Sequence, residues 1–192
     1  NLVPVLPVAI AGSATSVCAV SAGSSFVHFL DATGKLVVSI NPGSNNLGTV
    51  TSEVFDQGPS VITQACNTST NPAWKTAALG RSWKITPQFN LAATVQFPFE
   101  DAEMNDLVVA STGTASNPRD DVSSRTDLKM SRFHDNVPGN GNQEDGNWWN
   151  NCTDGGTVIE MSQAGNGTIP LAIASTQYVQ FSTAGFSEFW LH

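Results

Sequence analysis

Short runs of β-prone residues, separated by clusters of turn residues, recur along the whole chain. Residues 26–30 and 35–40 are two such runs, and the loop Asp31-Ala32-Thr33-Gly34 between them predicts a β-hairpin. A second turn cluster at 41–46 leads into another run at 47–55, so we expect the hairpin to extend into a meander. A pattern of this kind is typical of an all-β protein.

The second half of the chain continues the pattern with one interruption. Residues 82–86 place Trp83 and Ile85 on one face of a strand, and 93–99 form another run. Because Pro98 cannot donate a ladder hydrogen bond, we expect that strand to lie at an edge or to end there. Residues 100–110 predict a short helix, since acidic residues occupy its start and apolar residues recur at helical spacing. The remaining predicted strands are 127–133, 157–161, 171–174, 178–182 and 186–191.

About nine or ten short strands and one short helix predict an all-β fold, a single β-sandwich of Ig-like or jelly-roll type. A chain of 192 residues suits one such domain. We place the sandwich at 20–192 and regard 1–19 as an N-terminal extended segment, either an edge strand or a linker. Its apolar run 2–11 contains two prolines and is about half the roughly 20 residues that span a bilayer, so we expect no membrane insertion.

The composition and net charge of the chain argue against some classes of binding partner and favour one location. Eight Lys and Arg against sixteen Asp and Glu give a net charge of -8, which repels phosphate backbones and anionic lipid, so we expect no nucleic-acid partner. Only 12% of residues are charged, and a surface of uncharged polar residues favours an extracellular protein. No basic start or cleavage site of a secretory signal is present, so we expect a mature fragment or an excised domain.

The chain has three cysteines, Cys18, Cys66 and Cys152. Their spacing matches neither a zinc site nor a redox pair, so outside the cell one disulfide and one free thiol are expected. The pairing stays open. We favour Cys66 with Cys152, because both lie in polar, loop-like surroundings, whereas Cys18 lies in an apolar run and is expected to be a small buried hydrophobe.

The longest irregular region, 134–156, carries two candidate sites. Oxygen-bearing side chains at Asp135, Asn140, Asn142, Glu144 and Asp145 are the ligands that calcium prefers, although the same residue types also suit any irregular loop. Calcium is therefore a possible cofactor, and no other cofactor is expected.

Trp148 and Trp149 are flanked by Asn147 and Asn150, and aromatic faces beside amides can stack on sugars and hydrogen-bond their hydroxyls. Trp74, in another polar loop, could contribute to the same glycan site. The alternative is that one of the paired tryptophans closes the end of the sandwich while the other covers the backbone of the loop. Trp83 and Trp190 are expected in the core.

Several segments of the sequence are considered together: residues 27–42 with 46–48, 80–85, 97–107, 127–134 and the final Gly185-Phe186-Ser187-Glu188-Phe189-Trp190-Leu191. They resemble a β-sandwich module of large secreted proteins of Bacteroidetes, in which the final segment often precedes the sorting domain of the type IX secretion route. Ser82 and Lys84 depart from the family's phrase at 80–85. The resemblance implies a fold, an export route and an extracellular or outer-surface location, and it transfers no active-site residues.

We therefore expect a non-catalytic structural or adhesion module of a secreted or surface-anchored bacterial protein. Its expected partners are other domains of the same polypeptide, and glycans or identical subunits are further candidates. Two alternatives stay open: a carbohydrate-binding module that uses Trp148 and Trp149, and a filament subunit that assembles by strand donation through residues 1–11. A catalytic role for His134 would need a cleft with a carboxylate and a nucleophile nearby.

Overall fold

The computed structural model describes residues 12–58, 61–64, 75–111, 122–135, 144–146, 157–161, 163–168 and 176–192. Within these ranges the chain forms the strands β1 (Ala14–Val20), β2 (Val27–Leu30), β3 (Leu36–Asn41), β4 (Gly48–Asp56), β5 (Val61–Gln64), β6 (Lys75–Ala78), β7 (Arg81–Pro87), β8 (Ala93–Glu100), β9 (Met130–His134), β10 (Thr157–Met161), β11 (Gly165–Thr168), β12 (Thr176–Thr183) and β13 (Glu188–Leu191), and the helix α1 (Asp101–Ser111).

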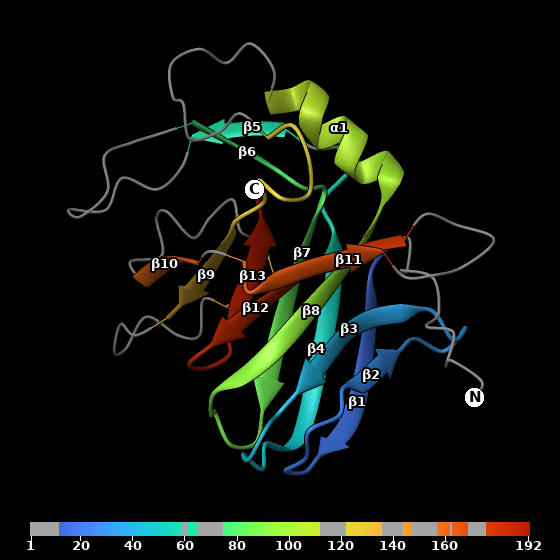
Figure 1. Ribbon diagram of the computed structural model, residues 1–192, viewed down its shortest axis with the longest axis vertical. Helices are drawn as coiled ribbons and strands as arrows, with labels where there is room; N and C mark the ends of the chain where they lie inside the picture. The colour runs from blue at the N-terminus through green and yellow to red at the C-terminus, as the bar shows by residue number, and fades with distance from the viewer. Residues whose placement is uncertain are drawn as a thin grey trace.

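Eleven of these strands form two antiparallel sheets that face each other (Figure 1). The six-stranded sheet has the order β1-β4-β7-β13-β9-β10, and the five-stranded sheet has the order β11-β12-β8-β3-β2. The remaining two strands, β5 and β6, pair only with each other. The predicted all-β sandwich is therefore confirmed.

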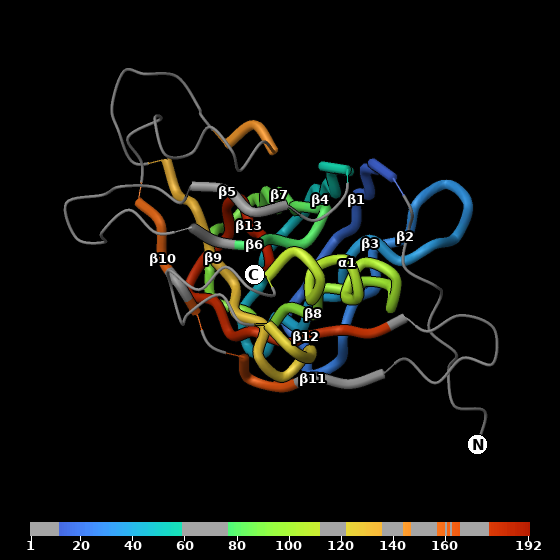
Figure 2. Tube along the Cα trace, turned by 90° about the horizontal axis from the view of Figure 1, so that it is seen from above, coloured from blue at the N-terminus to red at the C-terminus, as the bar shows by residue number. Residues whose placement is uncertain are grey.

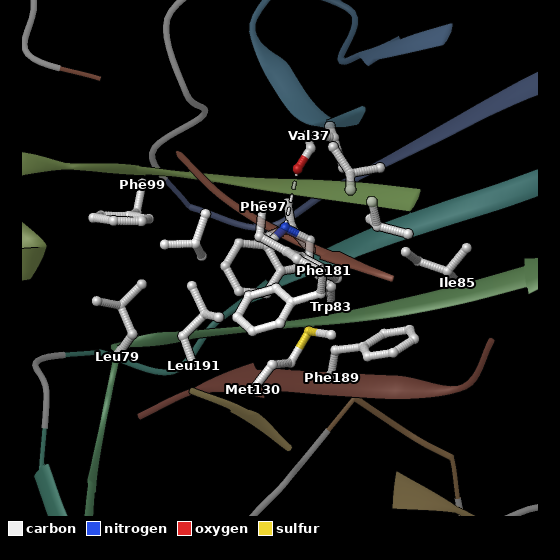
Figure 3. Close-up of a cluster of buried hydrophobic side chains, with 14 of the residues drawn as sticks. Val37, Leu79, Trp83, Ile85, Phe97, Phe99, Met130, Phe181, Phe189 and Leu191 are labelled. Atoms are coloured by element: carbon white, nitrogen blue, oxygen red, sulfur yellow. Dashed lines mark hydrogen bonds between the residues drawn. The ribbon is translucent and has the colours of Figure 1, made fainter. Parts of the chain in front are cut away.

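Aromatic side chains from both sheets meet in the space between them (Figure 3). Phe97 of β8 lies at the centre, with its ring centroid 4.9 Å from that of Trp83 and 5.4 Å from that of Phe189, both in the opposite sheet. All three side chains are fully buried. Trp83 and Phe97 pack edge to face, and Phe189 is tilted against Phe97; such aromatic contacts add to the stabilisation from burial, so these rings hold the two sheets together.

A β-bulge in β3 supplies the polar contact of this core. Pairing of β2 with β3 shifts register after Phe29, which leaves Val37 without a partner residue on β2. The Val37 carbonyl oxygen accepts a hydrogen bond of 3.0 Å from the indole nitrogen of Trp83 (Figure 3). Because a buried indole N–H needs an acceptor, the bulge makes it possible to bury the largest side chain of the core.

The hairpin predicted at 26–40 is confirmed, since β2 and β3 pair antiparallel. The predicted meander is wrong, because the turn after β3 carries the chain into β4 of the opposite sheet. The predicted edge position for the strand with Pro98 is also wrong: β8 pairs with β12 on one side and β3 on the other. Pairing with β3 stops at Gln96, however, so Pro98 lies beyond the end of that ladder.

The predicted helix is confirmed as α1, which lies with β5 and β6 at one end of the sandwich (Figures 1 and 2). The carboxylate of Glu103 accepts a hydrogen bond from the backbone N–H of Glu100 at 2.8 Å, a capping contact at the start of the helix. Met104 and Leu107 are buried in the main core, as their spacing predicts. None of the helices in the described part of the chain is long and apolar enough to cross a membrane.

The other predicted strands agree with the structure to different degrees. Strand β10 has the predicted bounds, β9 begins three residues later than predicted, and the predicted strand 171–174 lies outside the described residues. The glycine-containing β11 and the strands β5 and β6 were not predicted. β1 is an edge strand and crosses the expected boundary at residues 19 and 20, while residues 1–11 lie outside the described ranges.

Candidate functional site

A short segment, residues 144–146, is attached to the outer face of the six-stranded sheet through Gly146. The Gly146 N–H donates to Oε2 of Glu188 at 3.2 Å. The Gly146 carbonyl oxygen accepts from Oγ of Ser82 and from Nε2 of Gln57, each at 2.7 Å. Three side chains that are distant in sequence therefore hold the backbone of Gly146 on both sides of its Cα.

Residue 146 must be glycine for this contact to form. Its φ is +87°, a left-handed conformation that residues with a side chain rarely adopt. A Cβ atom at this position would lie 2.3 Å from the ring of Phe55. The backbone at Gly146 therefore packs directly against the Phe55 ring. We call the set of five residues the loop anchor: Phe55, Gln57, Ser82, Gly146 and Glu188.

The loop anchor is mostly polar yet largely buried: Phe55 and Gln57 are half-buried, and Ser82, Gly146 and Glu188 are buried. Ser82 and Glu188 are fully buried in β7 and β13, and their side chains share the face opposite the aromatic core. Beside them lies a second apolar cluster formed by Ala78, Phe133 and Trp190. Trp83 occupies the main core as predicted, whereas Trp190 is buried in this second cluster. Hydrogen-bonded polar groups in a buried setting fix the backbone that they contact.

Gly146 of the loop anchor directly precedes the predicted glycan-binding segment, Asn147-Trp148-Trp149-Asn150. Those four residues lie outside the described part of the chain, as do Trp74, Asn140, Asn142, Cys66 and Cys152. The glycan site, two of the five predicted calcium ligands and the favoured disulfide therefore stay predictions. Cys18 is a free thiol, and it is partly buried against the core rather than fully buried.

His134 does face a cavity, and a carboxylate and a hydroxyl lie beside it. Its Nδ1 is 3.1 Å from Oε1 of Glu144 and 3.2 Å from Oγ of Ser187. The Ser187 hydroxyl also donates to the same Glu144 oxygen at 3.2 Å. In a nucleophile relay the hydroxyl and the acid contact opposite ring nitrogens. Here both contact Nδ1, and Ser187 is buried, so the three groups form a closed triangle.

The same contacts engage the carboxylate predicted to bind calcium. Oε1 of Glu144 also accepts the backbone N–H of Asp135 at 3.2 Å. Across the described ranges, no group of three or more His, Cys, Asp or Glu side chains is placed to hold a metal ion. The calcium prediction therefore depends on Asn140 and Asn142.

The cavity beside His134 has a volume of about 200 Å³ and is also lined by Arg132 and Asn90. Nη1 of Arg132 donates to the carbonyl oxygen of Gly185 at 2.9 Å, while its Nε is buried and has no hydrogen-bond partner. Burial lowers the pKa of Arg132, and the charge of Glu144 opposes that shift. Arg132 therefore holds the turn before β13 through its hydrogen bond to Gly185, although burial disfavours its charged form.

A second hollow, of about 330 Å³, lies where β4, β7 and α1 meet. Arg81 at its base forms an ion pair of 2.5 Å with Glu103, and its guanidinium lies 5.9 Å from the Trp83 ring centroid. Further carboxylates line the hollow, from Asp56, Glu100 and Asp106. The ion pair, in which Arg81 is buried and Glu103 is partly exposed, joins β7 to the start of the helix, and the surplus of carboxylates makes the hollow acidic.

Of the residues that sequence analysis singled out, the structure thus brings together His134 and Glu144, in contact with each other and with Asp135. Gln57, Ser82, Gly146 and Glu188 were missed. The pair Asp145-Gly146 is a turn signal that could have marked the glycine, but its partners are 42 to 89 residues away in sequence. Comparison of the chain with protein-family models, with curated proteins and with solved structures finds no match in any of the three.

Proposed function

We propose that this chain is a non-catalytic structural and adhesion module of an exported bacterial protein, in which a rigid β-sandwich presents the loop 136–156 for recognition at the cell surface. The loop anchor is the observation that carries this proposal. Binding loops act from rigid scaffolds, and Gly146 is held by three hydrogen bonds and by the Phe55 ring. The sequence resemblance supplies the export route and the outer-surface location.

The His134 triangle supports the non-catalytic part of the proposal. A general base needs a free ring nitrogen that faces an accessible nucleophile. Ser187 is buried, and its hydroxyl donates to Glu144 while it contacts the same nitrogen as that carboxylate. In this arrangement the triangle ties the start of β13 to the end of β9.

A glycan is the ligand class that we favour for the loop. Gly146 is bonded directly to Asn147, and Trp148 and Trp149 follow. An anchored backbone reduces the conformational entropy lost when aromatic side chains stack on a sugar, so fixing residue 146 raises the affinity that the same side chains can reach.

The test is a glycan-array screen of the purified chain, with and without calcium, beside a double variant, Trp148→Ala with Trp149→Ala. We expect binding to specific glycans that is lost in the double variant while thermal unfolding is unchanged. Loss of binding after calcium removal would place the metal in the loop. Binding that survives the double substitution would contradict the role of the loop.

Catalysis is tested separately with chromogenic ester and glycoside substrates. We expect no turnover above that of buffer, and no difference between the chain and its His134→Ala variant. Turnover that depends on His134 would overturn the non-catalytic proposal even if glycan binding were found.

A further inference from the structure

The four edge strands of the sandwich are not equally protected against pairing with another chain. β2 has four residues and is paired irregularly, opposite the β-bulge of β3; β11 has four residues, of which two are glycine; and β10 has only five residues. Short length, irregularity and charge are the usual devices that keep a sheet edge from adding a further strand. Three of the four edges therefore have one.

β1 has none of these devices. It is seven residues long, Ala-Thr-Ser-Val-Cys-Ala-Val, without a charge, a proline or a glycine. All seven residues pair with β4, and within the described ranges β1 has no strand on its other side. Val17 at its centre is 57% exposed, and Thr15 and Ala19 are exposed on the same face. Its open backbone groups and β-branched side chains form a template for one more strand.

We propose that β1 pairs antiparallel with β1 of a second copy of this chain, so that two six-stranded sheets join across a two-fold axis at Val17. Centred there, the ladder includes all seven residues of each strand, and any other register shortens it. Val17 then lies opposite Val17 of the second copy, Thr15 opposite Ala19, and Ser16 opposite Cys18. Each pair is small and uncharged, so the edge is complementary to itself.

Charge does not oppose a second copy at this edge, because β1 itself carries no charged residue. The chain carries a net charge of -8, so two copies repel each other where their carboxylates meet. Next to β1, the outer face of the sheet presents an uncharged row of Val17, Thr51 and Thr86, which the register places side by side. A second copy can approach along β1 with no like charge directly opposite.

The first experiment is sedimentation equilibrium of the full chain under reducing conditions, from about 10 µM to about 1 mM. We expect a monomer–dimer equilibrium that does not proceed to larger species. Val17→Lys places two like charges opposite each other and should weaken the dimer at least about tenfold. Val109→Lys is the matched control, because Val109 is 75% exposed on α1, and it should leave the dimer unchanged.

A cross-link tests the register. In a Cys18→Ser background, Val17→Cys should give a covalent dimer on mild oxidation, with a bridge between the two copies of position 17 identified by mass spectrometry. Val109→Cys in the same background should not. A substitution pair in residues 1–11, Val5→Lys with Val8→Lys, should leave the dimer intact.

Three results would overturn the proposal: a monomer throughout the concentration range, a dimer that is unaffected by Val17→Lys, or a dimer without a bridge at position 17. Growth into polymers that Val5→Lys with Val8→Lys abolishes would also overturn it, in favour of strand donation. None of these results bears on glycan binding by the loop, so the two proposals fail independently.

Discussion

The two faces of the six-stranded sheet are buried by different means. On the inner face, Trp83 and Phe189 pack against the five-stranded sheet in an aromatic core. On the outer face, Ser82 and Glu188 are buried to the same degree, but they hold Gly146 through hydrogen bonds. Ser82 and Trp83 are adjacent in sequence, so one strand contributes to both environments.

The inner face mainly stabilises the fold, whereas the outer face mainly fixes the position of the loop at Gly146. Apolar burial on the inner face is non-directional and supplies most of the free energy of folding. Hydrogen bonds on the outer face contribute less net free energy, but they require a defined geometry. We therefore expect the largest losses of stability from substitutions on the inner face, and smaller losses, together with displacement of the loop, from substitutions on the outer face.

The largest effect should come from Trp83→Ala. It removes the central aromatic contact and leaves the Val37 carbonyl without its indole donor, so we expect a loss of about 3–5 kcal/mol in the free energy of unfolding. Urea denaturation followed by fluorescence and by circular dichroism measures it. A loss below about 1 kcal/mol would show that the inner face is not the main source of stability.

A smaller effect is expected from Gly146→Ala, with Gly34→Ala as its control. Both glycines have positive φ, but a Cβ at residue 34 meets nothing within 4 Å, whereas one at 146 overlaps Phe55. We expect a loss of about 1 kcal/mol at residue 34 and about 2–3 kcal/mol at residue 146. Only Gly146→Ala should also weaken glycan binding. Equal losses of stability and binding in the two variants would contradict the loop anchor.

Glu188→Ala should act more locally. It removes the acceptor of the Gly146 N–H, and we expect a loss of about 1–3 kcal/mol together with faster hydrogen exchange of that amide. Glu188→Gln keeps a carbonyl acceptor at the same place and should lose less. If the Gly146 amide exchanges equally slowly in all three proteins, Glu188 does not hold the loop.

The smallest effect, and one of opposite sign, is expected at Ser52 on the inner face. Its hydroxyl is fully buried and has no hydrogen-bond partner. Ser52→Ala removes this unsatisfied group, so we expect unchanged stability or a gain of up to about 1 kcal/mol, measured as a higher unfolding midpoint. A clear loss would show that the hydroxyl has a partner in solution.

Sequence patterns correctly predicted the elements that depend on residues close together in the chain. The hairpin at 26–40 follows from two apolar runs and a short turn, and α1 follows from acidic residues before apolar ones at helical spacing. The crossing from β3 to β4 was not predictable in this way, because the turn residues at 41–46 are the same whether the chain pairs with its neighbour or enters the other sheet. Only the core contacts decide between these paths.

The candidate site was less predictable than the fold. Alternation in β7 correctly buries Trp83 and Ile85, but it predicts that Ser82 on the other face is exposed. Ser82 is buried because Gly146, 64 residues later, accepts its hydrogen bond. The oxygen-rich loop suggested calcium for Glu144, yet that carboxylate contacts His134 and Ser187. Such pairings depend on the tertiary fold, and the residue types alone do not specify them.

The register of the six-stranded sheet determines how it would respond to a pulling force. Ala14 pairs with Val54, Val54 with Trp83, and Trp83 with Phe189, so the start of β1 and the middle of β13 lie in one row across the sheet. Pulling on Ala14 and Leu191 would therefore open the hydrogen bonds between β1 and β4 one at a time instead of shearing them together. β1 would detach first, at low force, and would expose the edge of β4 while the aromatic core stays intact.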